Sequence, residues 1–377
     1  MTRTRVYLHI GEPKCGTTFL QDVLWRNRAE LARYGVTLPG TDGADHYRAA
    51  QDLRDLPQDA DDPGITWHGA WTALARQARG AGGVAVITHE LLIGADLRQA
   101  RRAVECLAPA EVHVIVTSRD LASLLPAEWQ ETVKHRNART WQEWLGDIID
   151  TPPRRRRPRA KWFWTAHDTV AVLRRWSEVV PRERVHLVTV PRTGAPPDLL
   201  WRRFASVLGI ADAPVDFGRV RANASLGLSE VELLRRLNAR LSELPQWFYA
   251  RNVKNTLAHT VLAGRSGAGR VAVPAERHAW VREQSARRVQ QLGALGVDIV
   301  GDLGELDAPD VIATEGDPSA ASDADLLDAA LDVLAHTIER RYEHARKPPR
   351  MLSRSPVVAR WGPTVKRIGY VARRRLG

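Results

Sequence analysis

Short apolar segments alternate with longer amphipathic segments along most of this 377-residue chain. The segments between the apolar runs are long enough to form helices, which is typical of crossover connections between parallel strands. The pattern therefore predicts an α/β fold of three layers, in which a central, mostly parallel sheet is flanked by helices. Four apolar runs, rich in valine and isoleucine, have the length of buried strands: Val6–Ile10, Val84–Ile87, Val112–Thr117 and Val185–Val190.

Apolar residues recur at helical spacing in the segments between and after these strands. Ser229 and Glu232, three residues apart at the start of one such segment, fit a capping box. The predicted helices are Thr17–Arg33, Asp96–Leu107, Leu121–Asp150, Ala166–Val179, Asp198–Leu208, Ser229–Leu241 and Ala275–Leu295.

Three regions of the chain differ in composition. Residues 1–305 contain the alternating strands and helices, which predicts one P-loop-like domain. Residues 306–323 are rich in proline, glycine and acidic residues, as expected of a linker. Residues 324–377 begin with a helical pattern over Ala324–Arg346 and end in a basic tail, which predicts a C-terminal helical extension.

The chain carries a net charge of +11, concentrated in the run Arg154–Lys161 and in the C-terminal tail. Such charge favours anionic partners, which include nucleotides, nucleic acid and acidic lipid. The two cysteines, Cys15 and Cys106, are too few for a disulfide framework or a cysteine-based metal site. With no run of about 18 apolar residues and no apolar signal segment, we expect a reduced, cytoplasmic protein.

The loop Gly11–Thr18 joins the first predicted strand to the helix that follows. A glycine-bearing turn between a strand and a helix N-terminus forms an anion site, because free backbone N–H groups and the positive end of the helix dipole meet there. Gly11 and Gly16 have the spacing of a nucleotide-binding P-loop, but the lysine position after the second glycine holds Thr17. Lys14 lies inside the loop instead. The loop is therefore predicted to bind a phosphate other than the γ-phosphate of ATP.

Polar residues also follow the next two predicted strands. The second strand ends in Thr88-His89-Glu90, and the third ends in Ser118-Arg119-Asp120. Since the carboxyl ends of parallel strands lie at one edge of a sheet, these groups should face the same crevice as the glycine loop.

The sequence PKCGTT at residues 13–18 resembles the P-K-S-G-T-T loop of cytosolic-type and bacterial sulfotransferases, which use 3′-phosphoadenosine 5′-phosphosulfate as the sulfuryl donor. The segment VIVTSRDLASLLPAEWQ resembles their second element, in which an arginine at a strand end contacts the donor's 3′-phosphate. Residues 223–227 are similar to a loop that many bacterial members place before a helix. The resemblance spans residues 5–305, although only these segments are specific, and it is strongest to bacterial members.

The resemblance implies a donor site, with 3′-phosphoadenosine 5′-phosphate as the product and no metal. Lys14 would stabilise the negative charge that develops on the oxygen bridging phosphorus and sulfur. The implied donor-binding residues are Pro13, Lys14, Cys15, Gly16, Thr17, Thr18, Arg119, Ser123, Arg221, Asn223, Ser225 and Gly227.

Two positions depart from the family pattern. Cys15 stands where the family usually has serine, so its thiol is expected either to face the phosphate as a weak donor or to be a reactive thiol at a helix N-terminus. Ala127 stands eight residues after Arg119, where a serine often contacts the 3′-phosphate. The candidates to replace that serine are Ser123, Gln130 and Lys134.

Sulfuryl transfer to an alcohol also needs a group that accepts the hydroxyl proton. Glu90 is the preferred base, because the resemblance implies a glutamate near the end of the second strand. His89 is its rival, since imidazole titrates near neutrality and histidine is the base in the cytosolic mammalian-type branch. Successive side chains on an extended backbone diverge, so one of the two should face the donor.

The sequence thus predicts a sulfotransferase whose acceptor is a hydroxyl or amine of a small molecule, a carbohydrate or a glycolipid. One alternative is a P-loop kinase or another nucleotide-binding enzyme, although the missing lysine weakens it. The other is a basic protein that binds nucleic acid or a membrane surface through its charged segments. We expect no nucleic-acid partner, and the basic C-terminal tail is a candidate for peripheral contact with an anionic membrane.

Overall fold

The computed structural model describes residues 3–57, 66–218, 225–265, 269–313 and 316–346. The chain divides into two compact units, residues 1–329 and residues 330–377. The first unit contains the sheet and the cavity described below. The described part of the second unit belongs to helix α14 (Asp323–Arg346), which forms the predicted C-terminal helical extension.

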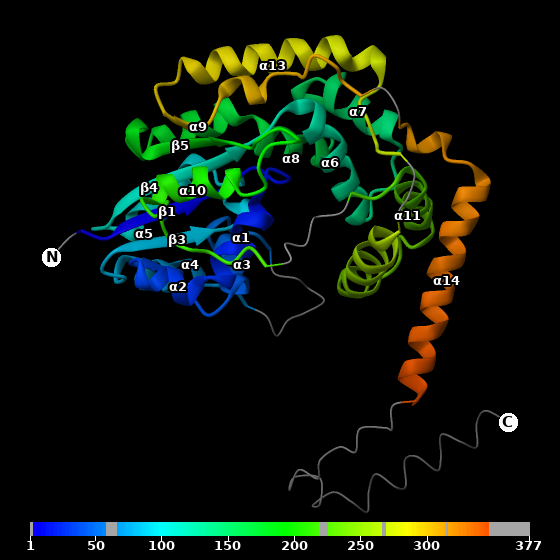
Figure 1. The fold of residues 1–377 in the computed structure, drawn as a ribbon, viewed down its shortest axis with the longest axis horizontal. Helices are drawn as coiled ribbons and strands as arrows, with labels where there is room; N and C mark the ends of the chain where they lie inside the picture. The colour runs from blue at the N-terminus through cyan, green and yellow to red at the C-terminus, as the bar shows by residue number, and fades with distance from the viewer. Residues whose placement is uncertain (1–2, 58–65, 219–224, 266–268, 314–315, 347–377) are drawn as a thin grey trace, which may run out of the picture. The chain divides into compact units, whose positions relative to one another are not determined.

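Six parallel strands form the central sheet, in the order β2-β3-β1-β4-β5-β6 (Figure 1). The predicted mostly parallel sheet is confirmed, and all four predicted strands are present. The two strands without a sequence signal, β2 and β6, are short edge strands. The strands are β1 (Arg5–His9), β2 (Val36–Thr37), β3 (Val84–Thr88), β4 (Glu111–Ser118), β5 (Val185–Thr189) and β6 (Asp298–Val300).

Helices cover both faces of the sheet, which gives the three predicted layers (Figure 1). Alternate residues of β1 point to opposite faces, so Val6 and Leu8 join one buried apolar cluster and Tyr7 joins the other. The first cluster is completed by α3 (Gly43–Leu53), α4 (Ala70–Arg79), α5 (Leu97–Leu107), α9 (Thr169–Ser177) and α13 (His278–Gly293). The second is completed by α1 (Thr17–Arg26), α2 (Arg28–Arg33) and α10 (Leu199–Leu208).

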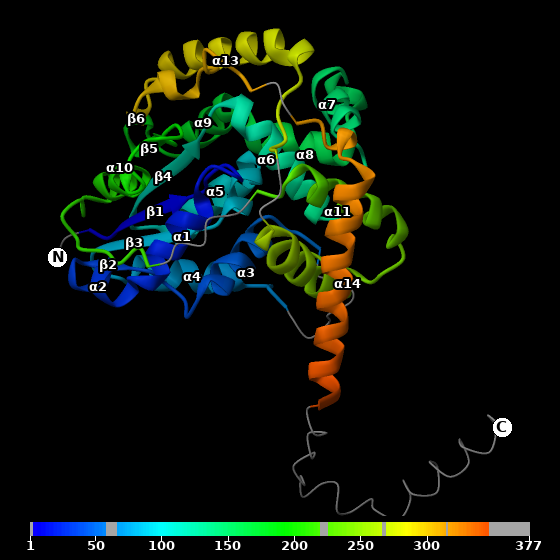
Figure 2. The ribbon, with the colours of Figure 1, turned by 45° about the vertical axis from the view of Figure 1, so that its right-hand side comes forward.

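A further group of helices lies beyond the carboxyl ends of the strands. Figures 1 and 2 both show α6, α8 and α11 at this edge, where ligands bind in parallel α/β sheets. The group comprises α6 (Leu121–Lys134), α7 (Trp141–Ile149), α8 (Pro158–His167), α11 (Leu228–Arg240), α12 (Gln246–Tyr249) and a π-helix over Ala250–Val261.

Several predicted helices are interrupted. The segment predicted as one helix over residues 121–150 forms α6 and α7, because Arg136 has a left-handed backbone (φ 68°) and Thr140 begins a new helix in a capping box with Glu143. The first helix is likewise broken at Asn27, whose side chain bonds both backbone groups of Asp216.

The capping box predicted at Ser229 is wrong. Gly227 is the N-cap residue of α11, and Ser229 lies one position inside the helix. Glu232 instead forms ion pairs with Arg235 and Arg236, at distances of 2.6 Å and 2.8 Å, on the same helix. The Glu232 carboxylate therefore binds arginines in the next turn of the helix and does not cap the helix N-terminus.

Candidate functional site

The glycine loop folds sharply around the start of α1. Gly16 is the N-cap residue with φ 80°, and Lys14 also has a left-handed backbone, with φ 63°. A Cβ atom on Gly16 would collide with Leu200, so both the backbone angle and the available space require glycine. No described side chain caps the N-terminus of α1. The first N–H groups of this helix are therefore open to an anion, as the sequence predicts.

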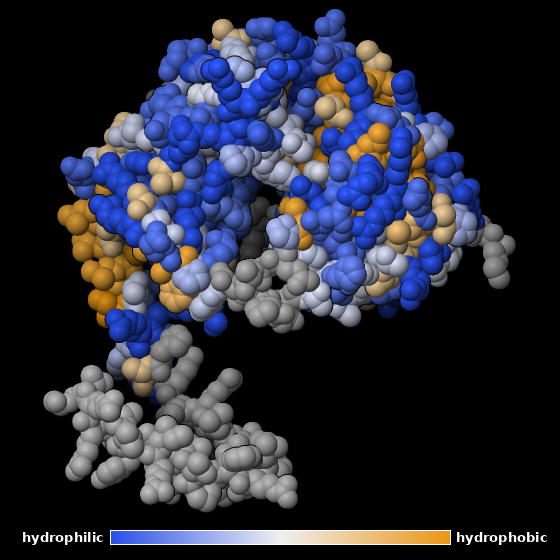
Figure 3. Space-filling model, turned by 180° about the vertical axis from the view of Figure 1, so that it is seen from behind, coloured by the Kyte–Doolittle hydropathy of each residue, from blue (hydrophilic) through white to orange (hydrophobic). Residues whose placement is uncertain are grey.

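A cavity of about 1030 Å³ opens beside this loop. In Figure 3, a deep hollow bordered by hydrophilic side chains is visible near the middle of the face seen from behind. The cavity brings together the loop, the ends of β3 and β4, and residues of α6, α8 and the π-helix. Of the residues predicted from the sequence, those that line it are Pro13, Lys14, Gly16, Thr17, Thr18, His89, Glu90, Arg119, Gln130, Lys134 and Ser225.

Other predicted residues lie elsewhere. Ser123 is in the first turn of α6, where its N–H donates to the Asp120 carboxylate, and it does not line the cavity. Gly227 caps α11. Arg221 and Asn223 lie outside the described residues. Of the three candidates to replace a serine at Ala127, the structure therefore places Gln130 and Lys134 at the cavity and excludes Ser123.

The expectations for the Cys15 thiol are wrong. Its side chain is fully buried behind the loop, and Sγ lies 3.6 Å from Oε2 of Glu12, facing that carboxylate rather than the cavity. Burial, together with the negative charge of Glu12, raises the pKa of this thiol well above its usual value. The thiol is therefore neither a phosphate donor nor a reactive group.

Arg119 links the end of β4 to the glycine loop. Its Nη1 donates to the backbone oxygen of Lys14 at 3.3 Å, and its Nε is buried without a partner among the described residues. The backbone oxygen of Arg119 accepts from Nη1 of Arg288, on α13, at 3.0 Å. Two strand ends thus place a guanidinium and the loop lysine at one edge of the cavity.

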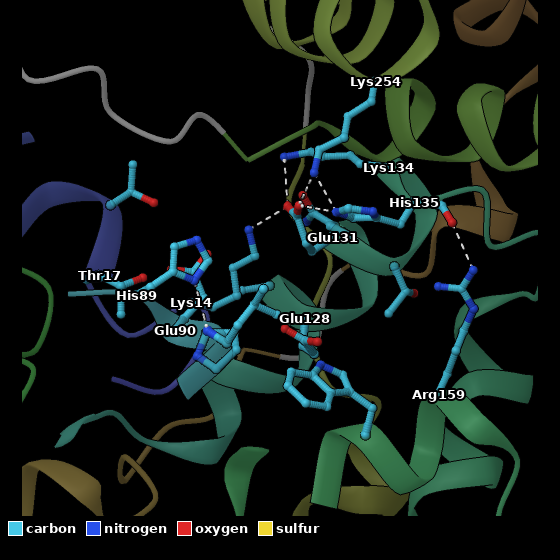
Figure 4. Close-up of a pocket in the computed structure, with 18 of the residues that line it drawn as sticks. Lys14, Thr17, His89, Glu90, Glu128, Glu131, Lys134, His135, Arg159 and Lys254 are labelled. Atoms are coloured by element: carbon cyan, nitrogen blue, oxygen red, sulfur yellow. Dashed lines mark hydrogen bonds and ion pairs between the residues drawn. The ribbon is translucent and has the colours of Figure 1, made fainter. Parts of the chain in front are cut away.

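Lys14 reaches across the cavity to α6. Its Nζ lies 2.5 Å from Oε2 of Glu131, and Lys134, His135 and Lys254 surround the same carboxylate at 4.0 Å, 3.1 Å and 3.2 Å (Figure 4). Burial opposes ionisation of Glu131, but His135 and the lysines hold its pKa far below the usual range. Burial lowers the pKa of Lys134 to about 8, and the positive charges of Lys14 and Lys254 act in the same direction.

The two candidate bases have different environments. Nδ1 of His89 accepts the N–H of Leu91 at 3.1 Å, so the proton of the neutral ring is assigned to Nε2. Burial lowers the pKa of His89, which keeps the ring neutral near pH 7. Burial alone would raise the pKa of Glu90, but His89 and a 3.1 Å hydrogen bond from Gln21 contribute to a net decrease. Glu90 is therefore ionised and able to accept a proton.

Behind the loop lies a buried charged network that the sequence pattern does not indicate. The Glu12 carboxylate accepts from the Thr169 hydroxyl and lies 3.4 Å from Nη2 of Arg288. His167 lies between two carboxylates, 3.7 Å from Glu12 and 3.7 Å from Glu128. Burial lowers the pKa of His167, but these two carboxylates outweigh it and raise that pKa to about 9. The network ties the loop to α6, α8, α9 and α13.

Sequence reasoning missed part of the cavity wall. Glu131 lies one helical turn after Ala127 on α6, so helical spacing could have placed it on the cavity side. Arg159 belongs to the basic run and lines the cavity from α8, where it donates to the backbone oxygen of His135 at 2.8 Å. Lys254 comes from the π-helix, and no local pattern marks it.

Comparisons with known proteins add one structural similarity. No family model matches the chain, and no curated protein matches it. Among solved structures, the chain is similar to a sulfotransferase from Alicyclobacillus acidocaldarius, with 16% sequence identity and a TM-score of 0.40 over 66% of this chain and 95% of that chain. The chain has a three-layer α/β fold in which the N-terminus of α1, without a side-chain cap, lies at the carboxyl edge of the sheet.

Proposed function

We propose that this protein is a sulfotransferase that moves a sulfuryl group from 3′-phosphoadenosine 5′-phosphosulfate to a hydroxyl or amine of an acceptor. The observation that carries this proposal is the position of Lys14. It lies inside the glycine loop, on a left-handed backbone, and extends its ammonium group into the cavity. A P-loop kinase would place its lysine after Gly16, where this chain has Thr17.

The residues at the cavity edge fit a donor that carries several anionic groups. The uncapped N-terminus of α1 and the hydroxyl groups of Thr17 and Thr18 offer hydrogen-bond donors to a phosphate. Arg119, at the neighbouring strand end, supplies a guanidinium for a second phosphate. The donor would supply an activated sulfuryl group, and Lys14 would stabilise the negative charge left on the phosphate side as that group departs.

We propose Glu90 rather than His89 as the base. The Nδ1 lone pair of His89 is occupied by the Leu91 N–H, and Nε2 carries the ring proton. The Glu90 carboxylate lines the cavity and is about one third exposed, at 35%. Its lowered pKa keeps it ionised, so it can orient an acceptor hydroxyl and take its proton as the oxygen attacks.

The kinase alternative receives no support from the carboxylate at the end of β4. Asp120, which follows Arg119, is the N-cap residue of α6 and accepts the N–H of Ser123 at 2.7 Å. This carboxylate therefore has a structural role in capping a helix. The geometry favours a reaction that relies on Lys14 and Arg119 for charge stabilisation.

The proposal is tested by ligand-induced stabilisation, since a ligand that binds only the folded state raises the melting temperature. We expect 3′-phosphoadenosine 5′-phosphate to stabilise the wild-type chain and ATP with Mg²⁺ to have little effect. Arg119→Gln should weaken the stabilisation, whereas Lys161→Gln, which removes an exposed charge on α8, should not. Stabilisation by ATP with Mg²⁺ but not by the bisphosphate would overturn the proposal.

A further inference from the structure

We infer that the acceptor of this enzyme carries a fixed negative charge, which binds a basic subsite formed by Lys134, Lys254 and Arg159. This inference rests on the proposed function, because it names the acceptor class of the same cavity. The three side chains come from α6, the π-helix and α8, and all three line the cavity.

Positive charge in the cavity exceeds what its carboxylates neutralise. Five basic side chains line the cavity, against the carboxylates of Glu90, Glu128 and Glu131. Glu128 also lies against His167, a buried, positively charged residue that does not line the cavity. Part of the negative charge of Glu128 is therefore neutralised by His167. Glu131 alone faces three lysines. Because Lys14 and Arg119 would face the donor's phosphates, the basic residues left for a further anionic group are Lys134, Arg159 and Lys254. The basic residues of the lining are Lys14, Arg119, Lys134, Arg159 and Lys254.

We assign Lys134, a sequence candidate for the 3′-phosphate contact, to the acceptor side instead, because it lies at the opposite end of α6 from Arg119. Arg119 precedes the first turn of α6, and Lys134 is the last residue of that helix. At 1.5 Å per residue, this helix extends about 20 Å. Lys14 reaches Glu131, three residues before Lys134, so the reacting group would lie next to the basic subsite, while Arg119 would hold the donor's second phosphate at the other end of the helix. A charge bound by Lys134 and Lys254 therefore belongs to a molecule on the acceptor side.

The local structure holds the two lysines of the subsite close together. Lys254 Nζ lies 3.2 Å from the Glu131 carboxylate, and Lys134 Nζ lies 4.0 Å from it. Lys134 has a side-chain exposure of only 7%, and burial, together with the nearby lysines, outweighs the charge of Glu131 and lowers the Lys134 pKa to about 8. An anion beside these groups would relieve that repulsion. The π-helix that carries Lys254 is a rare geometry that is frequent at functional sites.

The surroundings also suit a sugar-sized acceptor. Trp247 and Phe248 lie in α12, just before the π-helix, and are 49% and 39% exposed, while Gln246 of the same helix lines the cavity. Exposed aromatic faces can stack on sugar rings, and charge-assisted hydrogen bonds bind carboxylate, phosphate or sulfate groups. The shared chemistry of the predicted acceptor is therefore an alcohol or amine that bears one of these anionic groups.

The test measures acceptor-side binding while the donor site is filled. The protein is saturated with 3′-phosphoadenosine 5′-phosphate and titrated with glucose, glucose 6-phosphate, glucuronate and inorganic phosphate. We expect glucose 6-phosphate to bind at least about tenfold more tightly than glucose, because a charge-assisted hydrogen bond contributes on that order. Glucuronate and inorganic phosphate distinguish a carboxylate preference from a phosphate preference. Lys254→Gln and Arg159→Gln should each remove most of the advantage, whereas the exposed control Lys161→Gln should keep it.

The outcomes separate this inference from the proposed function. If the bisphosphate binds but the anionic probes bind no better than glucose, the inference is wrong and the proposed function stands. The inference is also wrong if Lys254→Gln weakens the bisphosphate as much as glucose 6-phosphate, because Lys254 would then belong to the donor site. If the bisphosphate itself does not bind, the proposed function fails. The basic subsite is then tested by itself, by comparing the binding of inorganic phosphate to the wild type and to Lys254→Gln without the bisphosphate.

Discussion

The ammonium group of Lys14 lies 2.5 Å from the Glu131 carboxylate, so the basic side chain of the glycine loop is ion-paired to helix α6. A donor anion that uses Lys14 must compete with this carboxylate. We therefore expect Glu131 to limit the affinity for the proposed donor while it holds Lys14 inside the cavity.

Replacing Glu131 should consequently strengthen donor binding. We expect Glu131→Gln to bind 3′-phosphoadenosine 5′-phosphate about threefold to tenfold more tightly, because one competing charge is removed. Titration calorimetry measures the change. Glu283→Gln, which alters an exposed carboxylate on α13, is the matched control and should bind like the wild type. Unchanged or weaker binding by Glu131→Gln would show that the ion pair does not oppose the donor.

Removal of the Lys14 ammonium should affect turnover more than folding. We expect Lys14→Ala to reduce kcat about 10²–10³-fold, as found when a group that stabilises transition-state charge is deleted. The assay follows release of 3′-phosphoadenosine 5′-phosphate, with Lys161→Ala as the matched lysine control. Urea unfolding checks that both variants remain folded. Near wild-type turnover by Lys14→Ala would assign charge stabilisation to another residue.

Glu90 and His89 can be distinguished by parallel substitutions. We expect Glu90→Gln to lower kcat about 10²–10⁴-fold while bisphosphate affinity is nearly unchanged, since proton acceptance contributes to the transition state alone. His89→Asn should have a smaller effect. The pKa of Glu90 lies below its usual value, so the wild-type rate should fall only in acid below about pH 4.5. A larger loss in His89→Asn than in Glu90→Gln would transfer the base to histidine.

The buried imidazole of His167 should make stability depend on pH. Its pKa is raised to about 9 in the folded state, from an ordinary value of 6.5. Folding therefore gains from this group fully below pH 6.5, and the gain disappears as the pH rises through about 9. We expect the free energy of unfolding to fall by on the order of 3 kcal/mol across this window.

Urea unfolding at pH 6.5 and pH 9.5 measures this loss in the wild type and in His167→Gln. The variant should lack it, while groups such as Lys134 change equally in both proteins. Should His167→Gln not fold, Glu128→Gln removes one of the two carboxylates that raise the pKa, so it should reduce the loss. Equal pH dependence in all folded proteins would show that His167 is not the responsible group.

The fold could be predicted largely because β1, β3, β4 and β5 are apolar runs whose residues are almost all buried on both faces. The edge strands β2 and β6 have two and three residues, too few for a pattern. Helix breaks were missed where distant contacts cause them. The break at Asn27, for example, depends on Asp216, which lies 189 residues further along the chain.

The candidate site likewise contains residues that the sequence predicts and residues that it does not. Lys14, Glu90 and Arg119 follow strands, so the parallel topology alone predicts that they meet. Lys254 and Arg159 reach the cavity from segments whose place depends on tertiary packing. The orientation of Cys15 could not be predicted, because it depends on where the Glu12 carboxylate is buried. The thiol points toward that carboxylate, behind the loop.

The contact between Arg288 and Glu12 joins residues separated by 276 positions. A fragment that ends after β5 would contain every residue of the glycine loop. It would lack α13 and therefore the Arg288 guanidinium that neutralises the Glu12 carboxylate. This contact with the loop can therefore form only after nearly the whole first unit has been synthesised. Such distant closure is associated with slow folding. Donor binding by a truncated chain would consequently be lost together with α13, although the glycine motif itself is intact.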